Sequence, residues 1–132
     1  MIRRYLVAIA LAVPTALEAQ DSLRVACDSA MTTIDMRRCA SRDLESAQRD
    51  LQRYLQEARR VAANRAQLDS SQAAWVRYRD VACRAAASEY EGGTMQPLVV
   101  LGCLRDLTRD RIRQVYNAHL RMSDTALPEP KG

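Results

Sequence analysis

Apolar residues recur every three or four positions along three stretches of the chain, and this spacing predicts three amphipathic helices. The first stretch runs from about Ser41 to Ala63. A shorter helical turn precedes it, because Thr32 and Asp35 have the spacing of a capping pair. The pattern leaves open whether the turn and the stretch form one bent helix. Asn64 is expected to end this helix, since asparagine tolerates the left-handed backbone of a helix terminus. The apolar positions of this first stretch are Leu44, Ala47, Leu51, Leu55, Ala58 and Ala62.

The second helix is expected to begin near Asp69, which has the spacing of a capping box with Gln72, and to run to about Tyr90. Its apolar residues fall into two stripes rather than one. A helix with two apolar stripes has two neighbours, so this helix is expected to lie in the middle of the bundle. One stripe comprises Leu68, Trp75, Tyr78, Ala82 and Ala85, and the other comprises Val76, Cys83, Ala87 and Tyr90.

Glycine and proline separate the second helix from the third. Gly92 and Gly93 end the second helix, because glycine adopts the backbone angles of a helix terminus at no steric cost. Pro97 stands where the third helix starts, and the apolar pattern carries this helix to about Leu120. The sequence therefore predicts an all-α fold, a small antiparallel bundle of about three helices with a short N-terminal helical turn. The inner face of the third helix comprises Leu101, Leu104, Thr108, Ile112 and Val115.

The start of the chain departs from this helical pattern. Residues 1–4 are a short basic start, residues 5–17 are almost entirely apolar, and Ala19 offers a small residue for cleavage. This order predicts a secretory signal peptide over residues 1–19. An uncleaved membrane anchor is the alternative, but the apolar run is shorter than the ~20 residues that a membrane span needs.

Signal cleavage defines the expected organisation of the rest of the chain. We expect a helical domain over residues 20–122 and a disordered tail, rich in proline, over residues 123–132. The protein is expected to be exported, periplasmic or secreted, with no stable membrane span after cleavage.

Export changes what the cysteines indicate. An even number of cysteines outside the cytosol favours disulfides. A zinc site is disfavoured, because no two cysteines are spaced C-x-x-C and His119 is the only histidine. The four cysteines are Cys27, Cys39, Cys83 and Cys103.

Helix geometry predicts how these cysteines pair. Cys83 lies seven residues before Tyr90, where the second helix is expected to end, and Cys103 lies six residues after Pro97. Both therefore stand about 10 Å from the Gly-Gly turn, at the same height on antiparallel neighbours. This favours a Cys83–Cys103 disulfide, which leaves the first two cysteines to join each other. Each closed loop is expected to contribute roughly 2–4 kcal/mol by constraining the unfolded chain.

Charge and composition exclude several classes of function. The formal net charge of +4 is mild, and the charges are interspersed rather than clustered, so a nucleic-acid partner is not expected. The chain lacks a glycine-rich phosphate loop, and it has no Ser-His-Asp set beyond what chance supplies. We therefore expect a protein of 132 residues and one domain that is not an enzyme, with no catalytic residue, no metal and no cofactor.

Three segments together resemble a known family. They are QAAWVRYRDVAC (72–83), YEGG (90–93) with a proline shortly after, and CLRDLTRDR (103–111). The chain resembles the lysozyme inhibitor LprI-like family of bacterial envelope proteins from near Cys27 to about Tyr116. This resemblance implies a small exported helical domain with disulfides, and inhibition of lysozyme or a related muramidase by protein–protein binding. The matching positions are Cys27, Cys39, Gln72, Trp75, Arg79, Asp80, Cys83, Gly92, Gly93, Cys103, Leu104, Thr108 and Arg111.

The motif residues are expected to be mostly structural. Trp75 lies on an apolar stripe, which favours a place in the core over a role as a binding anchor. Arg79, one turn further on, is expected to lie over the Trp75 ring in a cation–π contact. Arg79 and Asp80 point about 100° apart on a helix, so each is expected to pair elsewhere, in a structural ion-pair network rather than a ligand site. Thr108 is expected to bond back to a carbonyl within its own helix. The motif set is Gln72, Trp75, Arg79, Asp80, Thr108 and Arg111, and the partners considered for the Asp80 carboxylate are Arg84, Arg105 and Arg111.

The connection between the second and third helices is the candidate binding loop. It is expected to be exposed and to be held at its base by the Cys83–Cys103 disulfide, and loops on rigid scaffolds commonly carry recognition. A plain helix–helix turn is the alternative. Because many lysozymes are basic, as this chain is, an inhibitor needs a locally acidic face, for instance around Asp80, Glu89 and Glu91. The loop comprises Glu91, Gly92, Gly93, Thr94, Met95 and Gln96.

A second function fits the same sequence features. A structural or adaptor module of the cell envelope, with no inhibitory activity, has the same need for a stapled helical fold. Its partners are other envelope proteins or peptidoglycan.

Overall fold

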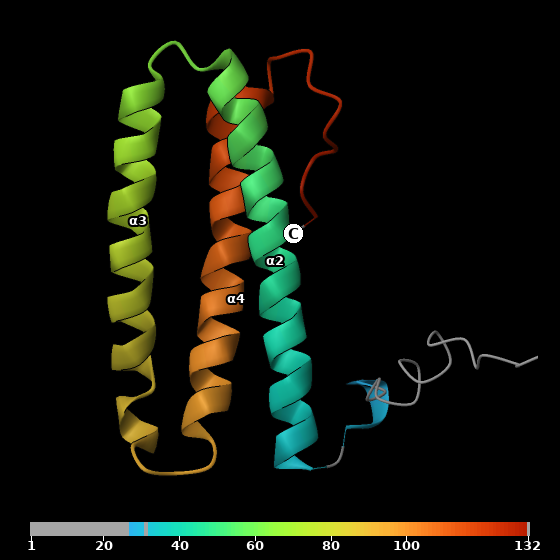
Figure 1. The fold of residues 1–132 in the computed structure, drawn as a ribbon, viewed down its shortest axis with the longest axis vertical. Helices are drawn as coiled ribbons and strands as arrows, with labels where there is room; N and C mark the ends of the chain where they lie inside the picture. The colour runs from blue at the N-terminus through green and yellow to red at the C-terminus, as the bar shows by residue number, and fades with distance from the viewer. Residues whose placement is uncertain (1–26, 31, 132) are drawn as a thin grey trace, which may run out of the picture.

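The computed structural model describes residues 27–30 and 32–131 of the chain. These residues form three long α-helices and three short helical turns, and they contain no strand (Figure 1). The prediction of a small all-α bundle with two disulfides is therefore confirmed, whereas the expected signal peptide over residues 1–19 lies outside the described residues. The long helices are α2 (Thr33–Val61), α3 (Arg65–Ala86) and α4 (Gln96–Val115), and the turns are η1 (Cys27–Ser29), η2 (Ser88–Tyr90) and the π-helical η3 (Tyr116–Leu120).

The three long helices alternate in direction along the chain. In Figure 1, α2 rises, α3 descends and α4 rises again, so α4 is antiparallel to α3 and parallel to α2. α4 packs against both of the other helices and lies between them, as Figure 1 shows.

The expectation that the second helix lies in the middle is therefore wrong, because the third helix, α4, has that place. α3 buries only Leu68 and Cys83 within its span. Tyr78 is 60% exposed, and Val81 is almost equally exposed, so part of the apolar surface of α3 faces solvent. Helical spacing identifies an apolar stripe, but it does not tell whether the stripe meets another helix or water.

α2 begins and continues as one uninterrupted helix. The Thr32 hydroxyl oxygen accepts a hydrogen bond from the Asp35 backbone N–H at 3.1 Å, as the capping pair predicted. The helix then runs from Thr33 to Val61, so the short turn and the first stretch belong to the same element.

The connection between α2 and α3 differs from the sequence expectation. The Asn64 side-chain oxygen accepts from the Gln67 backbone N–H at 3.0 Å, so Asn64 caps the start of α3 rather than the end of α2. Asp69 lies inside α3, where its carboxylate accepts a 2.6 Å hydrogen bond from the Arg59 Nε of α2. The expected capping box at Asp69 is wrong, because Asn64, five residues earlier in the chain, already caps the first backbone donors of the helix.

The principal apolar cluster lies where α2, α4 and η3 meet. The Tyr54 and Tyr116 rings pack edge to face with centroids 6.3 Å apart, a favoured aromatic geometry. The eight buried members of the cluster are Leu51, Tyr54, Leu55, Ala58, Leu68, Ile112, Val115 and Leu120.

The tail after η3 lies against this cluster. Leu127 packs against it, and the Tyr54 hydroxyl donates a 2.6 Å hydrogen bond to the Pro128 carbonyl oxygen. Burial raises the pKa of this hydroxyl, which keeps it protonated as a donor. The tail, expected to be disordered, has no regular helix after η3, but these contacts join it to the bundle in a way that its sequence did not predict.

Two disulfides join elements of the fold covalently. Cys27 in η1 is bonded to Cys39 in α2, and Cys83 in α3 is bonded to Cys103 in α4. The Cα atoms of the two pairs are 5.6 and 5.5 Å apart, and this is the pairing that helix geometry predicted.

None of the helices in the described part of the chain has the length and apolar character that crossing a membrane requires.

Replacing Leu120 by alanine should destabilise the fold, because this side chain is fully buried in the cluster. The expected loss is about 2–4 kcal/mol of unfolding free energy, from lost transfer energy and the cavity left behind. Met122→Ala is the matched control, since Met122 is 96% exposed and should change stability very little. Urea unfolding of the oxidised proteins measures both, and equal stabilities for the two variants would contradict the assigned core.

Candidate functional site

The connection between α3 and α4 is built from consecutive hydrogen-bonded turns. The Gly93 N–H donates to the Tyr90 carbonyl at 2.9 Å, and the Gln96 N–H donates to the Gly93 carbonyl at 3.2 Å. The Gln96 side chain reaches back and accepts from the Gly92 N–H at 3.3 Å. Gly92 has a φ of 73°, which favours glycine, and a Cβ at Gly93 would lie only 3.2 Å from the Tyr90 oxygen. A side chain would be strained at Gly92 and crowded at Gly93, so the shape of this turn favours glycine at both positions.

The surface of this turn is apolar and acidic. Tyr90 is 46% exposed and Met95 is exposed to a similar degree, while Glu89 and Glu91 beside them face solvent. Residues 85–104 contain no lysine or arginine, although the chain as a whole is basic. The turn thus carries the locally acidic character that binding to a basic partner needs.

The predicted loop residues occupy this turn, but the exposed surface extends one element further back. Glu91, Gly92, Gly93, Thr94 and Met95 are exposed, and Gln96 is half-buried as the first residue of α4. Glu89 and Tyr90 belong to the preceding η2 turn. Sequence reasoning left η2 out because it treated residues up to Tyr90 as part of the second helix, whereas α3 ends at Ala86.

Two guanidinium groups lie over the Trp75 ring at the contact of α3 with α4. The Arg79 Cζ lies 5.2 Å from a Trp75 ring centroid, which confirms the expected cation–π contact. The Arg111 Cζ of α4 lies 5.8 Å from a Trp75 ring centroid. The ring therefore interacts with one arginine from each helix, and these contacts give Trp75 a structural role at the contact of α3 with α4.

Asp80 does not pair as the sequence predicted. Its carboxylate accepts hydrogen bonds from the Arg79 Nε at 3.0 Å and from the Arg79 Nη2 at 2.8 Å, and not from Arg84, Arg105 or Arg111. The directions of the two Cβ atoms do diverge, but the long arginine side chain folds back far enough for its head to reach its neighbour. The Arg79 side chain is only 13% exposed, so this ion pair is shielded on one side.

Arg111 extends the same cluster across to polar groups of α3. Its Nε donates to the Gln72 side-chain oxygen at 3.0 Å, and its Nη2 donates to the Ser71 hydroxyl at 2.8 Å. No carboxylate in the described part of the chain pairs with Arg111, and burial lowers its pKa. Thr108, fully buried one turn earlier, donates to the Leu104 carbonyl at 2.6 Å, as expected. The motif side chains of both helices are thus engaged within the fold.

A cavity of about 500 Å³ lies between the tail and the bundle and was not predicted. Charged side chains of both signs line it, and no periodic signal in the tail sequence marks it. The charged residues that line the cavity are Asp50, Arg53, Arg109, Glu129 and Lys131.

Over residues 27–30 and 32–131, no group of three or more histidine, cysteine, aspartate or glutamate side chains is placed to hold a metal ion.

Comparison with known proteins links this arrangement to a family. The family described as "Lysozyme inhibitor LprI" matches residues 26–115, which include all four cysteines, the Trp75 cluster and the α3–α4 turn. An uncharacterised protein of Rhizobium meliloti (strain 1021) is 32% identical over 106 residues, covering 67% of this chain and 75% of that protein. No solved structure matches the chain significantly.

Replacing Arg111 by alanine should weaken the contact between α3 and α4. The change removes hydrogen bonds to Gln72 and Ser71 and one of the two cations over Trp75, with an expected loss of about 1–2 kcal/mol of unfolding free energy. Arg109→Ala is the control, because this exposed arginine of α4 has no partner carboxylate in the described residues and should stay within about 0.5 kcal/mol. Trp75, the only tryptophan, reports unfolding by fluorescence, and equal midpoints for the two variants would show that Arg111 holds nothing together.

Proposed function

The chain belongs to the lysozyme inhibitor LprI family, and on that premise we propose that it is an exported inhibitor of lysozyme-type glycan hydrolases. The family implies a lysozyme-inhibitor-like role, and the match over residues 26–115 is the observation that carries the proposal. The protein acts by binding the enzyme and not by catalysis. The exposed turn between α3 and α4 supplies a surface for that binding.

Export is part of this proposal. Two disulfides and the family point to an extracytoplasmic protein, because disulfides persist in oxidising compartments. Residues 1–19 act as the signal peptide, which leaves residues 20–122 as the inhibitory domain and residues 123–132 as its tail. The mature protein is periplasmic or secreted.

The binding surface is the turn formed by residues 88–96. A glycan hydrolase binds its substrate in a concave cleft, and a convex turn can enter such a cleft. Tyr90 and Met95 provide exposed apolar area, and the hydrogen bonds of the turn and the Cys83–Cys103 disulfide limit the entropy lost on binding.

The acidic groups of the turn fit the rim of the cleft rather than its floor. Most glycoside hydrolases carry two carboxyl groups at the scissile bond, which would repel Glu89 and Glu91. A basic surface around the cleft attracts the same two side chains and speeds association. In this arrangement the apolar pair enters the cleft and the two glutamates contact its edge.

An adaptor role is the second candidate, and one observation favours it. Tyr78 and Val81 on α3 are exposed although both are large and apolar, and inhibition through the turn does not use them. An envelope protein bound along α3 would cover this face. The absence of inhibition at a large molar excess over every lysozyme tried would favour this second role.

Replacing Tyr90 by alanine should weaken inhibition at least about tenfold, since aromatic residues at the centre of an interface often supply more than 1.4 kcal/mol. The measurement is peptidoglycan turbidity, with oxidised protein titrated against several lysozymes. Tyr78→Ala removes an exposed tyrosine from α3, outside the turn, and should leave inhibition unchanged. If Tyr78→Ala abolishes inhibition and Tyr90→Ala does not, the binding surface lies on α3 and not on the turn.

Reversing the charge of Glu91 should slow association with a basic lysozyme. Glu91→Lys removes the attraction between the turn and a basic rim, and the association rate is expected to fall about threefold or more at low salt and less at 0.5 M salt. Glu45→Lys makes the same change of charge on α2, away from the turn, and serves as the control. Surface plasmon resonance at several salt concentrations measures both rates, and equal rates would exclude steering by the turn.

A further inference from the structure

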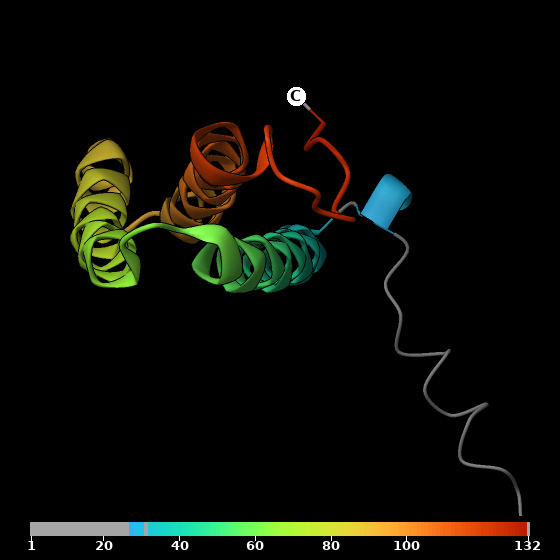
Figure 2. The ribbon, with the colours of Figure 1, turned by 90° about the horizontal axis from the view of Figure 1, so that it is seen from above.

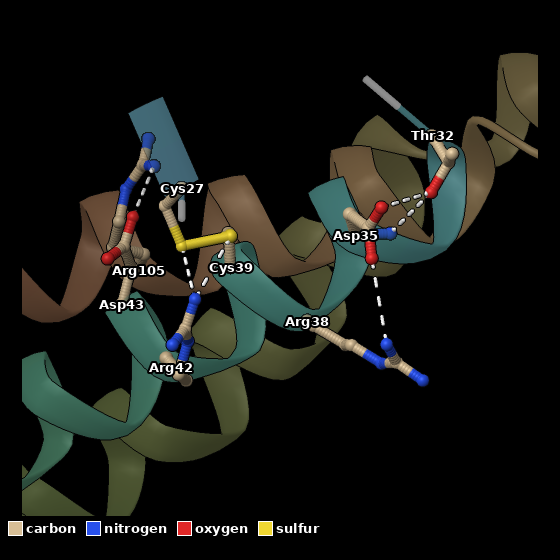
Figure 3. The surroundings of a disulfide bond; sticks show 8 residues. All are labelled: Cys27, Thr32, Asp35, Arg38, Cys39, Arg42, Asp43 and Arg105. Atoms are coloured by element: carbon tan, nitrogen blue, oxygen red, sulfur yellow. Dashed lines mark hydrogen bonds and ion pairs between the residues drawn. A yellow bond between two sulfur atoms is a disulfide. The ribbon is translucent and has the colours of Figure 1, made fainter. Parts of the chain in front are cut away.

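The Cys27–Cys39 disulfide has one exposed end and one buried end. Cys27 lies in η1 and is exposed, whereas Cys39 is buried in the first turns of α2. Figure 3 shows the Arg42 guanidinium directed at the bond from one turn further along the helix. Its Nη2 donates to the Cys39 Sγ at 3.2 Å and also contacts the Cys27 Sγ.

Arg42 is the cation in Figure 3 that faces the sulfurs. Arg38 is turned away from the bond and pairs with the Asp35 carboxylate at 3.6 Å. Arg105, from α4, pairs with Asp43 at 3.9 Å. The disulfide is therefore placed against a positive charge that two neighbouring arginines do not supply.

The second disulfide offers an internal contrast. Cys83 is fully buried between α3 and α4, and Cys103 is half-buried. Neither sulfur receives a hydrogen bond from an arginine within residues 32–131. The two disulfides thus differ in access and in the charge beside them, although they have the same bond chemistry.

We propose that Cys27–Cys39 is a thiol-exchange site at which Cys27 becomes covalently modified by a thiol. An incoming thiolate attacks the exposed Cys27 sulfur and forms a new S–S bond to it. The Cys27–Cys39 bond breaks, and its electron pair leaves on the Cys39 sulfur as a thiolate. One disulfide replaces another, so no external oxidant or reductant is needed for this step.

Arg42 lowers the barrier by stabilising the leaving group. A positive charge next to a cysteine lowers the pKa of its thiol, and a thiol of lower pKa leaves faster in exchange. Burial of Cys39 directs attack to the other sulfur, because the nucleophile must approach in line from solvent. The reacting chemistry is that of a thiolate, which either a small thiol or a protein dithiol can supply.

Opening this bond leaves the bundle closed. The Thr32 cap of α2 does not involve either sulfur, and the Cys83–Cys103 bond still joins α3 to α4. What is released is η1, which the bond ties to α2. The modification is therefore compatible with a folded protein.

Oxidised protein incubated with glutathione and then trapped with iodoacetamide tests the proposal by peptide mass spectrometry. The expected product carries glutathione on Cys27 and a carbamidomethyl group on Cys39, with Cys83–Cys103 intact. Arg42→Gln should slow its formation at least about threefold, because the leaving thiolate loses its counter-charge. Arg38→Gln removes an equal charge four residues earlier on the same helix and should react at the wild-type rate. Trp75 fluorescence confirms that each variant is folded.

A parallel reaction with reduced thioredoxin identifies the source of the thiolate. A dithiol that opens the same bond leaves Cys27 and Cys39 both reduced, whereas glutathione leaves the mixed disulfide. Opening of Cys83–Cys103 first, glutathione found on Cys39 instead of Cys27, or equal rates for Arg42→Gln and Arg38→Gln would each overturn the proposal. None of these readouts depends on whether the protein inhibits a lysozyme.

Discussion

α3 is held against α4 by little apolar surface, since it buries only Leu68 and Cys83 along its length. The Cys83–Cys103 bond and the stack of Arg79, Trp75 and Arg111 hold it instead. These two contacts fix the height and the rotation of α3 relative to α4. The turn that joins the helices takes its shape from that junction, because its ends are the ends of the same two helices. A short turn on a loosely packed helix would otherwise sample many conformations and lose more entropy on binding.

Much of this fold could be predicted from periodicity and cysteine spacing. The three helices, the cap at Thr32 and the Cys83–Cys103 pairing all follow from distances along a helix, which the sequence states directly. The order of the helices in space could not be predicted. Tyr78 has the spacing of a predicted buried stripe but faces solvent, and only the position of α4 decides that. The hydrogen bond from Tyr54 to Pro128 could not be predicted either, because the proline-rich tail has no periodic pattern of apolar residues.

In the candidate site, too, some side-chain contacts could be predicted from the sequence and others could not. Local contacts such as Arg79 over Trp75, or Thr108 to Leu104, were predictable because helix geometry sets them. The partner of Asp80 was not, since a long arginine can reach its own neighbour by bending. Gln72 and Arg111 meet across two helices, and no spacing along one helix reveals that contact. The motif residues are therefore explained by the junction, and the binding role falls to exposed groups outside the motif, such as Tyr90 and Met95.

The two disulfides of the protein have different roles, one structural and one in the proposed thiol exchange. Cys83–Cys103 is shielded, and a bond that sets the geometry of the junction must resist exchange. Cys27–Cys39 joins η1 to α2 and lies against Arg42, so its opening leaves the contacts among α2, α3 and α4 in place. η1 and the α3–α4 turn lie at the same end of the bundle but on opposite sides of it, as Figures 1 and 2 show. A thiol adduct on Cys27 thus changes the surface near η1, while the contacts between α3 and α4 keep the shape of the turn on the opposite side. Binding through the turn and thiol exchange at Cys27 are separable for this reason. A substitution that changes one of these activities is expected to leave the other unchanged.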